Sequence, residues 1–157
     1  MQLTSHSVEE TQDFARRMAQ VVRPGDVILL VGDLGAGKTH FAQGFADGLG
    51  IPDIPTSPTF NLVCEYRGGP LPLYHFDLYR LEDASQLDDI DYWGITEGDG
   101  VSLVEWGDKF SEAADEACLT LDFAVSPEGV RTISIVPATV RGEELVSALE
   151  SSSSTSV

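Results

Sequence analysis

The stretch Val27-Ile28-Leu29-Leu30-Val31-Gly32-Asp33-Leu34-Gly35-Ala36-Gly37-Lys38-Thr39 joins an apolar run to a glycine-rich turn and a polar pair. Its first residues are apolar and partly β-branched, which is typical of a buried strand. Apolar side chains then recur at helical spacing, as Phe41, Phe45 and Leu49, and Gly50 follows where a helix commonly ends. A strand, a glycine-rich loop and a helix in this order predict an α/β fold.

The loop fits the G-x-x-x-x-G-K-[ST] pattern through Gly32, Gly37, Lys38 and Thr39. In such loops backbone N–H groups surround phosphate oxygens, the lysine pairs with the β- and γ-phosphates, and the hydroxyl holds Mg²⁺. Glycine permits positive φ and a close approach of backbone to phosphate, and the helix N-terminus favours an anion. We therefore predict that a nucleotide contacts the loop and the start of the helix: Asp33, Leu34, Gly35, Ala36, Gly37, Lys38, Thr39 and His40.

The charge of the chain restricts its partners. The formal charge of the 157 residues is −17, from 9 Lys+Arg against 26 Asp+Glu. A field of this sign repels a polyanion, so we expect no tight, direct binding of tRNA or DNA by the chain alone. A nucleotide site remains compatible, because Lys38, loop amides, a helix dipole and a metal ion supply local positive potential.

The sequence shows no feature of membrane or metal-cluster proteins. Its start lacks the apolar segment of a signal peptide, and no apolar run approaches the ~18 residues of a membrane span, so we expect a cytoplasmic protein without membrane contact. The two cysteines and three histidines show no metal-ligand spacing, and we expect reduced thiols and surface or packing histidines: Cys64, Cys118, His6, His40 and His75.

The flanking elements extend the α/β pattern. Ser7 and Glu10 form a capping-box signature that predicts a helix before the glycine-rich loop. After the loop and its helix, Phe60–Tyr66 and Leu73–Tyr79 are strand-like runs around Arg67–Pro70, which predicts an antiparallel hairpin. A hairpin at this point makes a mixed sheet more favourable than an all-parallel one.

The second half of the sequence contains one further helix–strand series. The predicted elements are a short acidic helix over 84–90, a strand over Val101–Trp106, a helix over Asp108–Ala117, strands over Cys118–Val125 and Val130–Val136, and a helix over Arg141–Glu150. We therefore predict a single P-loop NTPase-like domain over residues 1–150, with a mixed, largely parallel central sheet that contains an antiparallel hairpin. Residues 151–157 are expected to be a disordered, serine-rich tail.

Four ordered motifs carry a resemblance to a known family: Gly32–Thr39, Thr56–Thr59, His75–Arg80 and Leu103–Trp106. On these motifs the chain resembles the TsaE (YjeE) family, the small P-loop ATPases of bacterial tRNA threonylcarbamoyladenosine biosynthesis. The last three motifs are not general P-loop signatures. The resemblance implies a mixed-sheet P-loop fold, ATP and Mg²⁺ as ligands, and TsaB and TsaD as protein partners. In that family the partners transfer the threonylcarbamoyl group to adenosine 37 of tRNA, and ATP hydrolysis by TsaE supports their turnover.

The resemblance also implies roles for particular residues. Lys38 would bind phosphate, and Thr39 and Glu105 would hold Mg²⁺. Thr59 would lie on a switch-like segment near the γ-phosphate, Asp77 would orient or deprotonate water, and Trp106 would lie near the nucleotide. These residue types suit phosphoryl transfer, which needs a metal clamp, a positioned water and positive groups.

The residues themselves leave alternatives open. Asp77 and Glu105 are also explained as strand-end acids paired with Arg80 or Lys109, and Trp106 as a core residue. The chain departs from the family pattern at His40, where a second hydroxyl residue is common, and at Gly107, where proline is common.

Three other functions share parts of the pattern. A GTPase would use the D-x-x-G match at Asp91–Gly94, but neither lysine, Lys38 or Lys109, lies in an N-K-x-D sequence. A small-molecule kinase usually brings a cluster of lid arginines, whereas those after the loop are scattered: Arg67, Arg80, Arg131 and Arg141. A binding-only adaptor without hydrolysis is the third alternative.

Overall fold

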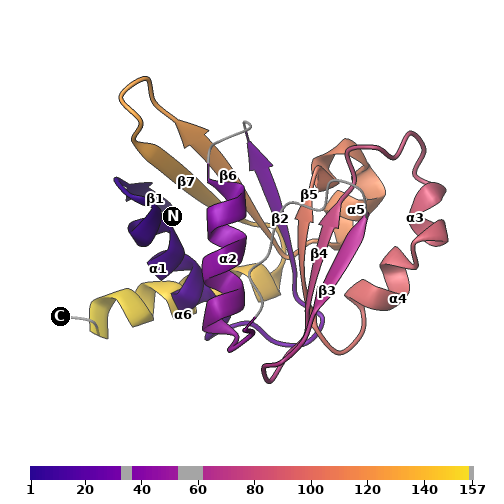
Figure 1. Cartoon of the computed structure of the whole chain (residues 1–157), viewed down its shortest axis with the longest axis horizontal. Coiled ribbons are helices and arrows are strands. Elements are labelled where there is room, and N and C mark those ends of the chain that lie inside the picture. The colour runs from indigo at the N-terminus through magenta and orange to yellow at the C-terminus, as the bar shows by residue number, and fades with distance from the viewer. Residues whose placement is uncertain (33–36, 53–61, 156–157) are drawn as a thin grey trace.

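A seven-stranded mixed sheet forms the centre of the protein, with helices on both faces (Figure 1). The computed structural model describes residues 1–32, 37–52 and 62–155. The strands, in the spatial order β1-β7-β6-β2-β5-β4-β3, are β1 (Gln2–Ser5), β7 (Arg131–Pro137), β6 (Leu119–Val125), β2 (Val27–Gly32), β5 (Val101–Glu105), β4 (Leu73–Asp77) and β3 (Val63–Tyr66).

The sheet is parallel at its centre and antiparallel at both edges. Strands β6, β2, β5 and β4 are mutually parallel. Strand β7 runs antiparallel to both β6 and β1, and β3 runs antiparallel to β4. The predicted mixed sheet is therefore confirmed, as is the pairing of the two strands predicted as a hairpin. Residues 60 and 61 of the first predicted strand lie outside the described residues.

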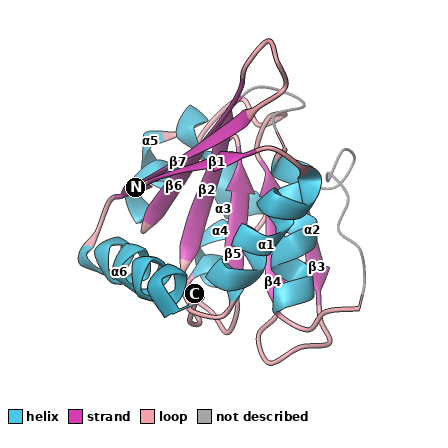
Figure 2. Cartoon of the chain, turned by 90° about the vertical axis from the view of Figure 1, so that its left-hand side faces the viewer, coloured by secondary structure: helices cyan, strands magenta, loops and turns pink. Residues whose placement is uncertain are grey.

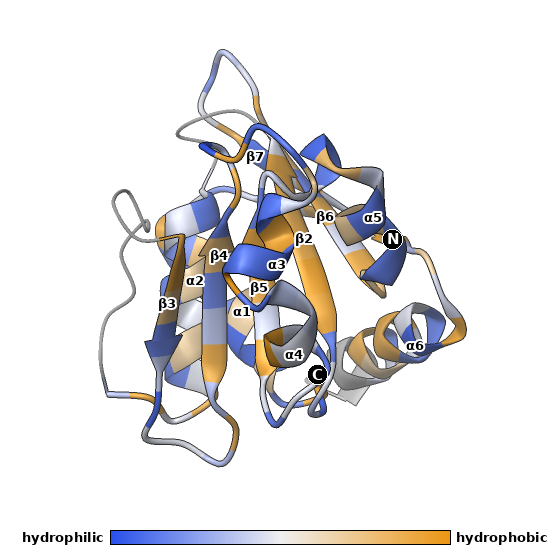
Figure 3. Cartoon of the chain, turned by 90° about the vertical axis from the view of Figure 1, so that its right-hand side faces the viewer, coloured by the Kyte–Doolittle hydropathy of each residue, from blue (hydrophilic) through white to orange (hydrophobic). Residues whose placement is uncertain are grey.

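The helices form two layers that cover opposite faces of the sheet. They are α1 (Val8–Ala19), α2 (Lys38–Gly48), α3 (Gln86–Asp89), α4 (Tyr92–Thr96), the 3₁₀ helix η1 (Gly107–Lys109), α5 (Ser111–Glu116) and α6 (Val140–Thr155). Apolar residues of α1, α2 and α6 share one buried cluster, and those of α3, α4 and α5 share the other. Figure 2 looks onto the layer of α1, α2 and α6, and Figure 3 onto the layer of α3, α4 and α5.

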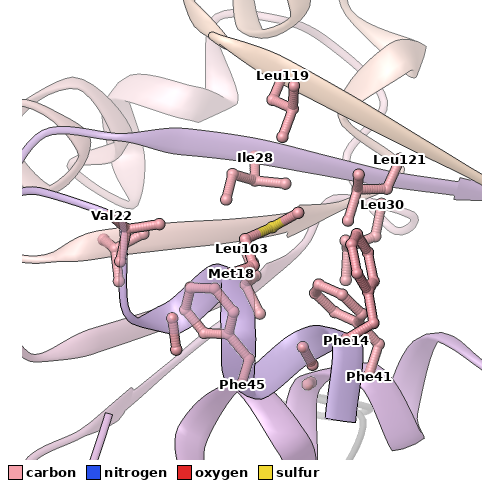
Figure 4. Packing of buried hydrophobic residues seen from close by; sticks show 14 of the residues in the cluster. Phe14, Met18, Val22, Ile28, Leu30, Phe41, Phe45, Leu103, Leu119 and Leu121 are labelled. Atoms are coloured by element: carbon pink, nitrogen blue, oxygen red, sulfur yellow. The ribbon is translucent and has the colours of Figure 1, made fainter. Parts of the chain in front are cut away.

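Strand β2 shows why the sequences of the central strands are unbroken apolar runs. Its alternate residues point to opposite faces, so Ile28 and Leu30 join the cluster under α1 and α2 (Figure 4), whereas Val27 and Leu29 join the other. A parallel strand covered on both faces has no solvent side and needs no polar alternation.

The predicted helix ends are confirmed at both positions. The backbone N–H of Glu10 donates to Ser7 Oγ at 3.1 Å, and the N–H of His6 donates to Glu10 Oε2 at 2.7 Å. At the other end, Gly50 follows the C-cap Leu49 of α2 with φ +76°.

The helices in the second half of the chain differ in part from the sequence prediction, and the predicted helix over 108–117 is divided into η1 and α5. The acidic segment forms α3 within the predicted range, but it is followed by α4, which the sequence did not predict. Helix α6 extends past Glu150, where the predicted helix ends, to Thr155. Within the described part of the chain, no helix is both long and apolar enough to span a membrane.

Close packing of α1 against α2 requires glycine on α2. A Cβ added to Gly44 would lie 2.6 Å from both Cα and the carbonyl oxygen of Gln12, and one added to Gly48 would lie 2.8 Å from Cα of Arg16. These atoms belong to the α1 backbone and cannot turn away. The two glycines therefore fix how closely α2 lies to α1.

Replacing Gly44 with alanine is expected to destabilise the protein, although Gly→Ala inside a helix normally stabilises. The added methyl group overlaps backbone of α1, and we expect a loss of about 1–3 kcal/mol in the free energy of unfolding. Urea unfolding measures it, with Ser147→Ala at an exposed position of α6 as the control. A Gly44→Ala protein at least as stable as wild type would show that the two helices are not packed this closely.

Candidate functional site

Three adjacent parallel strands end side by side, so that their carboxyl ends lie together at the same end of the sheet. Gly32, Glu105 and Asp77 are the last residues of β2, β5 and β4. Glu105 lies between the other two strands, since it is in register with Leu30 on one side and Asp77 on the other. In open α/β sheets this end is where ligands bind.

Two glycines on either side of residues 33–36 have backbone conformations that other residues rarely adopt. Gly32 has φ +130° and Gly37 has φ +108°. A Cβ on Gly32 would lie 2.1 Å from the carbonyl oxygen of Phe123 on β6, so this position excludes any side chain. Gly37 is the N-cap of α2. The predicted nucleotide contacts Asp33, Leu34, Gly35 and Ala36 lie outside the described residues.

Lys38 links the start of α2 to the ends of β2 and β5. Its side chain is buried, with Nζ donating to the carbonyl oxygen of Gly32 at 3.0 Å. The same Nζ lies 3.9 Å from Glu105 Oε1 and 5.7 Å from the centroid of the Trp106 ring. The ammonium group is thus already placed over the strand ends, where it can pair with an anionic ligand.

Glu105 is buried and contacts a histidine. Its Oε2 lies 2.7 Å from Nε2 of His75, a residue with no exposed surface. Of the two cations weighed from the sequence as partners of the strand-end acids, Lys109 instead donates to the carbonyl oxygens of Tyr79 and Leu81. His75 is therefore buried, and its Nε2 contacts a candidate metal ligand.

Asp77 is half-buried beside Glu105. Its Oδ1 accepts a hydrogen bond from the backbone N–H of Tyr79 at 3.0 Å. Burial raises the pKa of this carboxyl, the charge of Glu105 raises it further, and the Tyr79 N–H acts in the opposite direction. An acid whose pKa lies above that of an exposed aspartate is a better proton acceptor, which suits a group that activates water.

Trp106 is not a core residue. Its side chain is 43% exposed, and its ring lies 4.9 Å from that of Tyr79. The backbone at Trp106 has φ +62°, a left-handed conformation that turns the chain sharply at the end of β5. The indole is therefore held at the rim of the strand ends, near Lys38, as expected for a residue that contacts a ligand bound there.

Of the remaining residues predicted for the site, the structure describes only Thr39 and His40. Thr39 and His40 lie in the first turn of α2 and are partly buried, and the buried Nδ1 of His40 has no hydrogen-bond partner among the described residues. The predicted switch residue Thr59 lies outside the described residues.

The structure also places Arg131 beside the start of α2, which the sequence did not indicate. A Cβ added to Gly37 would lie 3.2 Å from Arg131 Cδ, so this side chain from the start of β7 runs along the beginning of α2. Arg131 is separated from the loop by about a hundred residues of sequence, and only the antiparallel return of β7 brings it close.

The residues at these strand ends suit the binding of Mg²⁺ together with a nucleoside triphosphate. Among the described residues, no group of three or more His, Cys, Asp or Glu side chains is arranged to hold a metal by itself. Mg²⁺ is usually bound through one or two protein oxygens plus substrate phosphates, which Glu105 and the Thr39 hydroxyl would supply. The glycine conformations at Gly32 and Gly37 and the buried Lys38 ammonium suit the phosphates.

Comparisons with known proteins agree on one family. The sequence model described as threonylcarbamoyl adenosine biosynthesis protein TsaE matches residues 5–133. A tRNA threonylcarbamoyladenosine biosynthesis protein TsaE from Bacillus subtilis (strain 168) is 44% identical over 137 residues, which covers 87% of this chain and 85% of the relative. The protein of the same description from Treponema pallidum (strain Nichols) is 37% identical over 135 residues, covering 86% of this chain and 99% of the relative.

A solved structure has the same fold. The crystal structure of Bacillus subtilis YdiB superposes with a TM-score of 0.81 at 36% sequence identity, covering 98% of this chain and 95% of that chain. The agreement extends over the whole sheet and both helical layers, beyond the glycine-rich loop.

Replacing Lys38 with alanine is expected to weaken ATP binding about 10- to 100-fold, because it removes charge-assisted hydrogen bonds worth roughly 1.5–3 kcal/mol. Isothermal titration with a non-hydrolysable ATP analogue measures the affinity. Arg67→Ala is the matched control: it removes the same charge from an exposed side chain that follows β3 at the opposite edge of the sheet. Equal affinities of Lys38→Ala and wild type would remove Lys38 from the phosphate site.

Proposed function

The chain belongs to the TsaE family of threonylcarbamoyl adenosine biosynthesis proteins, and from this premise we propose that it is a Mg²⁺-dependent ATPase that supports formation of threonylcarbamoyladenosine in tRNA. One observation supports the ATPase activity above all: a buried lysine from the loop helix, a buried glutamate and a half-buried aspartate meet at the ends of three neighbouring parallel strands. These are the groups that nucleotide hydrolysis requires.

Each of these groups has a distinct task in the proposed reaction. Lys38 would pair with the phosphates, and Thr39 and Glu105 would hold Mg²⁺, which when bound would neutralise charge that develops on the phosphate oxygens. Asp77 orients the attacking water and accepts its proton, for which its raised pKa is suitable. Thr59 is proposed to sense the γ-phosphate, and Trp106 to contact the nucleotide from the rim.

The surroundings of the GTPase motif argue against that rival function. Asp91 is the N-cap of α4, and Tyr92 is buried with its ring 5.0 Å from that of Phe76. The D-x-x-G match therefore begins a helix that packs against the sheet on the face covered by α3 and α5. The tyrosine inside the match is therefore a core residue, which does not suit a segment that has to rearrange as a switch.

Three of the four arginines that follow the glycine-rich loop lie far from one another, which argues against the clustered lid of a small-molecule kinase. Arg141 is engaged with Asp26, at 2.9 Å from Nε to Oδ1 and 2.9 Å from Nη2 to Oδ2, before the start of β2 and at the opposite edge of the sheet from Glu105. Arg67 pairs with Glu65 and Asp99, also away from the strand ends. Arg131 contacts the start of α2 from the side of β7, so these three side chains lie at separate places.

We further propose that ATP hydrolysis acts on the TsaB–TsaD pair. The formal charge of −17 disfavours direct contact with tRNA, so the effect on tRNA modification has to pass through another protein. ATP and ADP states differ in affinity for a partner only if a segment near the γ-phosphate changes conformation, and residues 56–59 are the proposed segment.

Replacing Asp77 with asparagine is expected to leave ATP affinity near that of wild type and to lower turnover by about 10²- to 10⁴-fold, because the lost proton acceptor acts mainly in the transition state. Steady-state hydrolysis in the presence of TsaB and TsaD measures turnover, and calorimetry measures affinity. Asp99→Asn is the control, since it is the same change at an exposed carboxylate on the opposite edge of the sheet. Undiminished turnover per folded molecule would make Asp77 a structural acid.

The proposed function predicts nucleotide-dependent binding to TsaB–TsaD. Complex formation measured in ATP, in ADP and without nucleotide should differ among the three conditions, and multi-turnover tRNA modification should require this protein. Equal binding in all three conditions would remove the switch, and full modification without the protein would remove the proposed function.

A further inference from the structure

His75 is the buried polar residue for which the proposed mechanism has no task. It is on β4 with one residue between it and Asp77, so both side chains project from the same face of the sheet. His75 has no exposed surface, and its Nε2 lies 2.7 Å from Glu105 Oε2. We propose that His75 is a positioning residue that holds Glu105 in the orientation needed to bind Mg²⁺, an inference that rests on the proposed ATPase function.

The two carboxylate oxygens of Glu105 have different surroundings. Oε2 contacts His75, whereas Oε1 faces Lys38, with Nζ at 3.9 Å. The histidine therefore fixes one oxygen and leaves the other directed toward the side of the loop lysine. A glutamate without this contact would be free to rotate about its terminal torsion, which is broad and weakly restricted.

The second ring nitrogen of His75 indicates which nitrogen carries the proton. Nδ1 is buried and has no hydrogen-bond partner among the described residues. A ring whose one proton is on Nε2 donates to the glutamate and leaves only an unpaired acceptor at Nδ1. The opposite tautomer would leave a buried N–H donor unsatisfied and place a lone pair against the carboxylate. The hydrogen-bond pattern thus assigns the proton to Nε2.

The geometry of the sheet makes His75 the natural support for Glu105. Strands β4 and β5 are parallel, with His75 in register with Leu103 and Asp77 in register with Glu105. The histidine reaches diagonally, on one face, to the residue opposite Asp77. One strand thus supplies both the proposed water-activating acid and the residue that orients the metal ligand.

Hydrogen bonds of this kind to metal ligands have measurable effects. Partners that orient a ligating side chain typically contribute about 10- to 100-fold in metal affinity. A histidine that only packs the core would change stability and would leave the dependence of nucleotide binding on Mg²⁺ as it is. The Mg²⁺ dependence of binding therefore separates a positioning role from a packing role.

The test measures binding of a non-hydrolysable ATP analogue by calorimetry, with Mg²⁺ and with a chelator, in two variants. His75→Leu removes the donor, and we expect an about 10- to 100-fold loss of affinity with Mg²⁺ and no loss with the chelator. His75→Gln keeps an N–H at a similar reach and should restore most of the Mg²⁺-dependent affinity. His6→Leu, the same substitution at an exposed histidine, is the matched control.

A second measurement uses the wild-type protein and does not depend on the variants being folded. Nitrogen NMR of the imidazole rings should show a proton on Nε2 of His75, and this proton should remain when Mg²⁺ and the analogue are added. A ring without a proton on Nε2 would overturn the proposal. An equal Mg²⁺ effect in His75→Leu and wild type would overturn it as well. If wild type itself gained no affinity from Mg²⁺, the proposed ATPase function would fail instead.

Discussion

Glu105 is an acid buried at the end of a central strand, and an isolated ionised carboxylate is costly to bury unless it is paired. The structure meets this constraint with one hydrogen-bonding partner, His75, and one nearby cation, Lys38. Lys38 belongs to the helix that follows the glycine-rich loop, and His75 belongs to the strand that ends in Asp77. The need to pair one buried acid thus connects the loop, β5 and β4, which are the three elements that form the site.

The position of these elements follows from packing elsewhere in the molecule. The parallel register of β2, β5 and β4 brings their last residues to one edge, and alternation along β4 puts His75 and Asp77 on the same face. Glycines on α2 let that helix lie against α1, and Gly32 passes β6 where no side chain fits. Close backbone contacts of α2 with α1 and of β2 with β6 therefore determine where the site lies. Its side chains come from helices and strands that precede or follow the loop in the sequence.

Much of this arrangement could be predicted from the sequence because the signals are local. The helix that begins at Lys38, the cap at Ser7 and the stop at Gly50 each depend on neighbouring residues, and the structure confirms all three. Strand β1 could not be predicted, because a short polar edge strand has little periodicity of its own and forms by pairing with β7. The same holds for the contacts of His75 and Arg131, which depend on the register of strands distant in sequence.

The most direct test of the account is a crystal structure of the protein with Mg²⁺ and a non-hydrolysable ATP analogue. The account predicts phosphates against Lys38 and the start of α2, a metal ion held between Thr39 and Glu105, and Asp77 facing the terminal phosphate. A nucleotide bound away from the ends of β2, β5 and β4, or a metal ion that Glu105 does not contact, would contradict it.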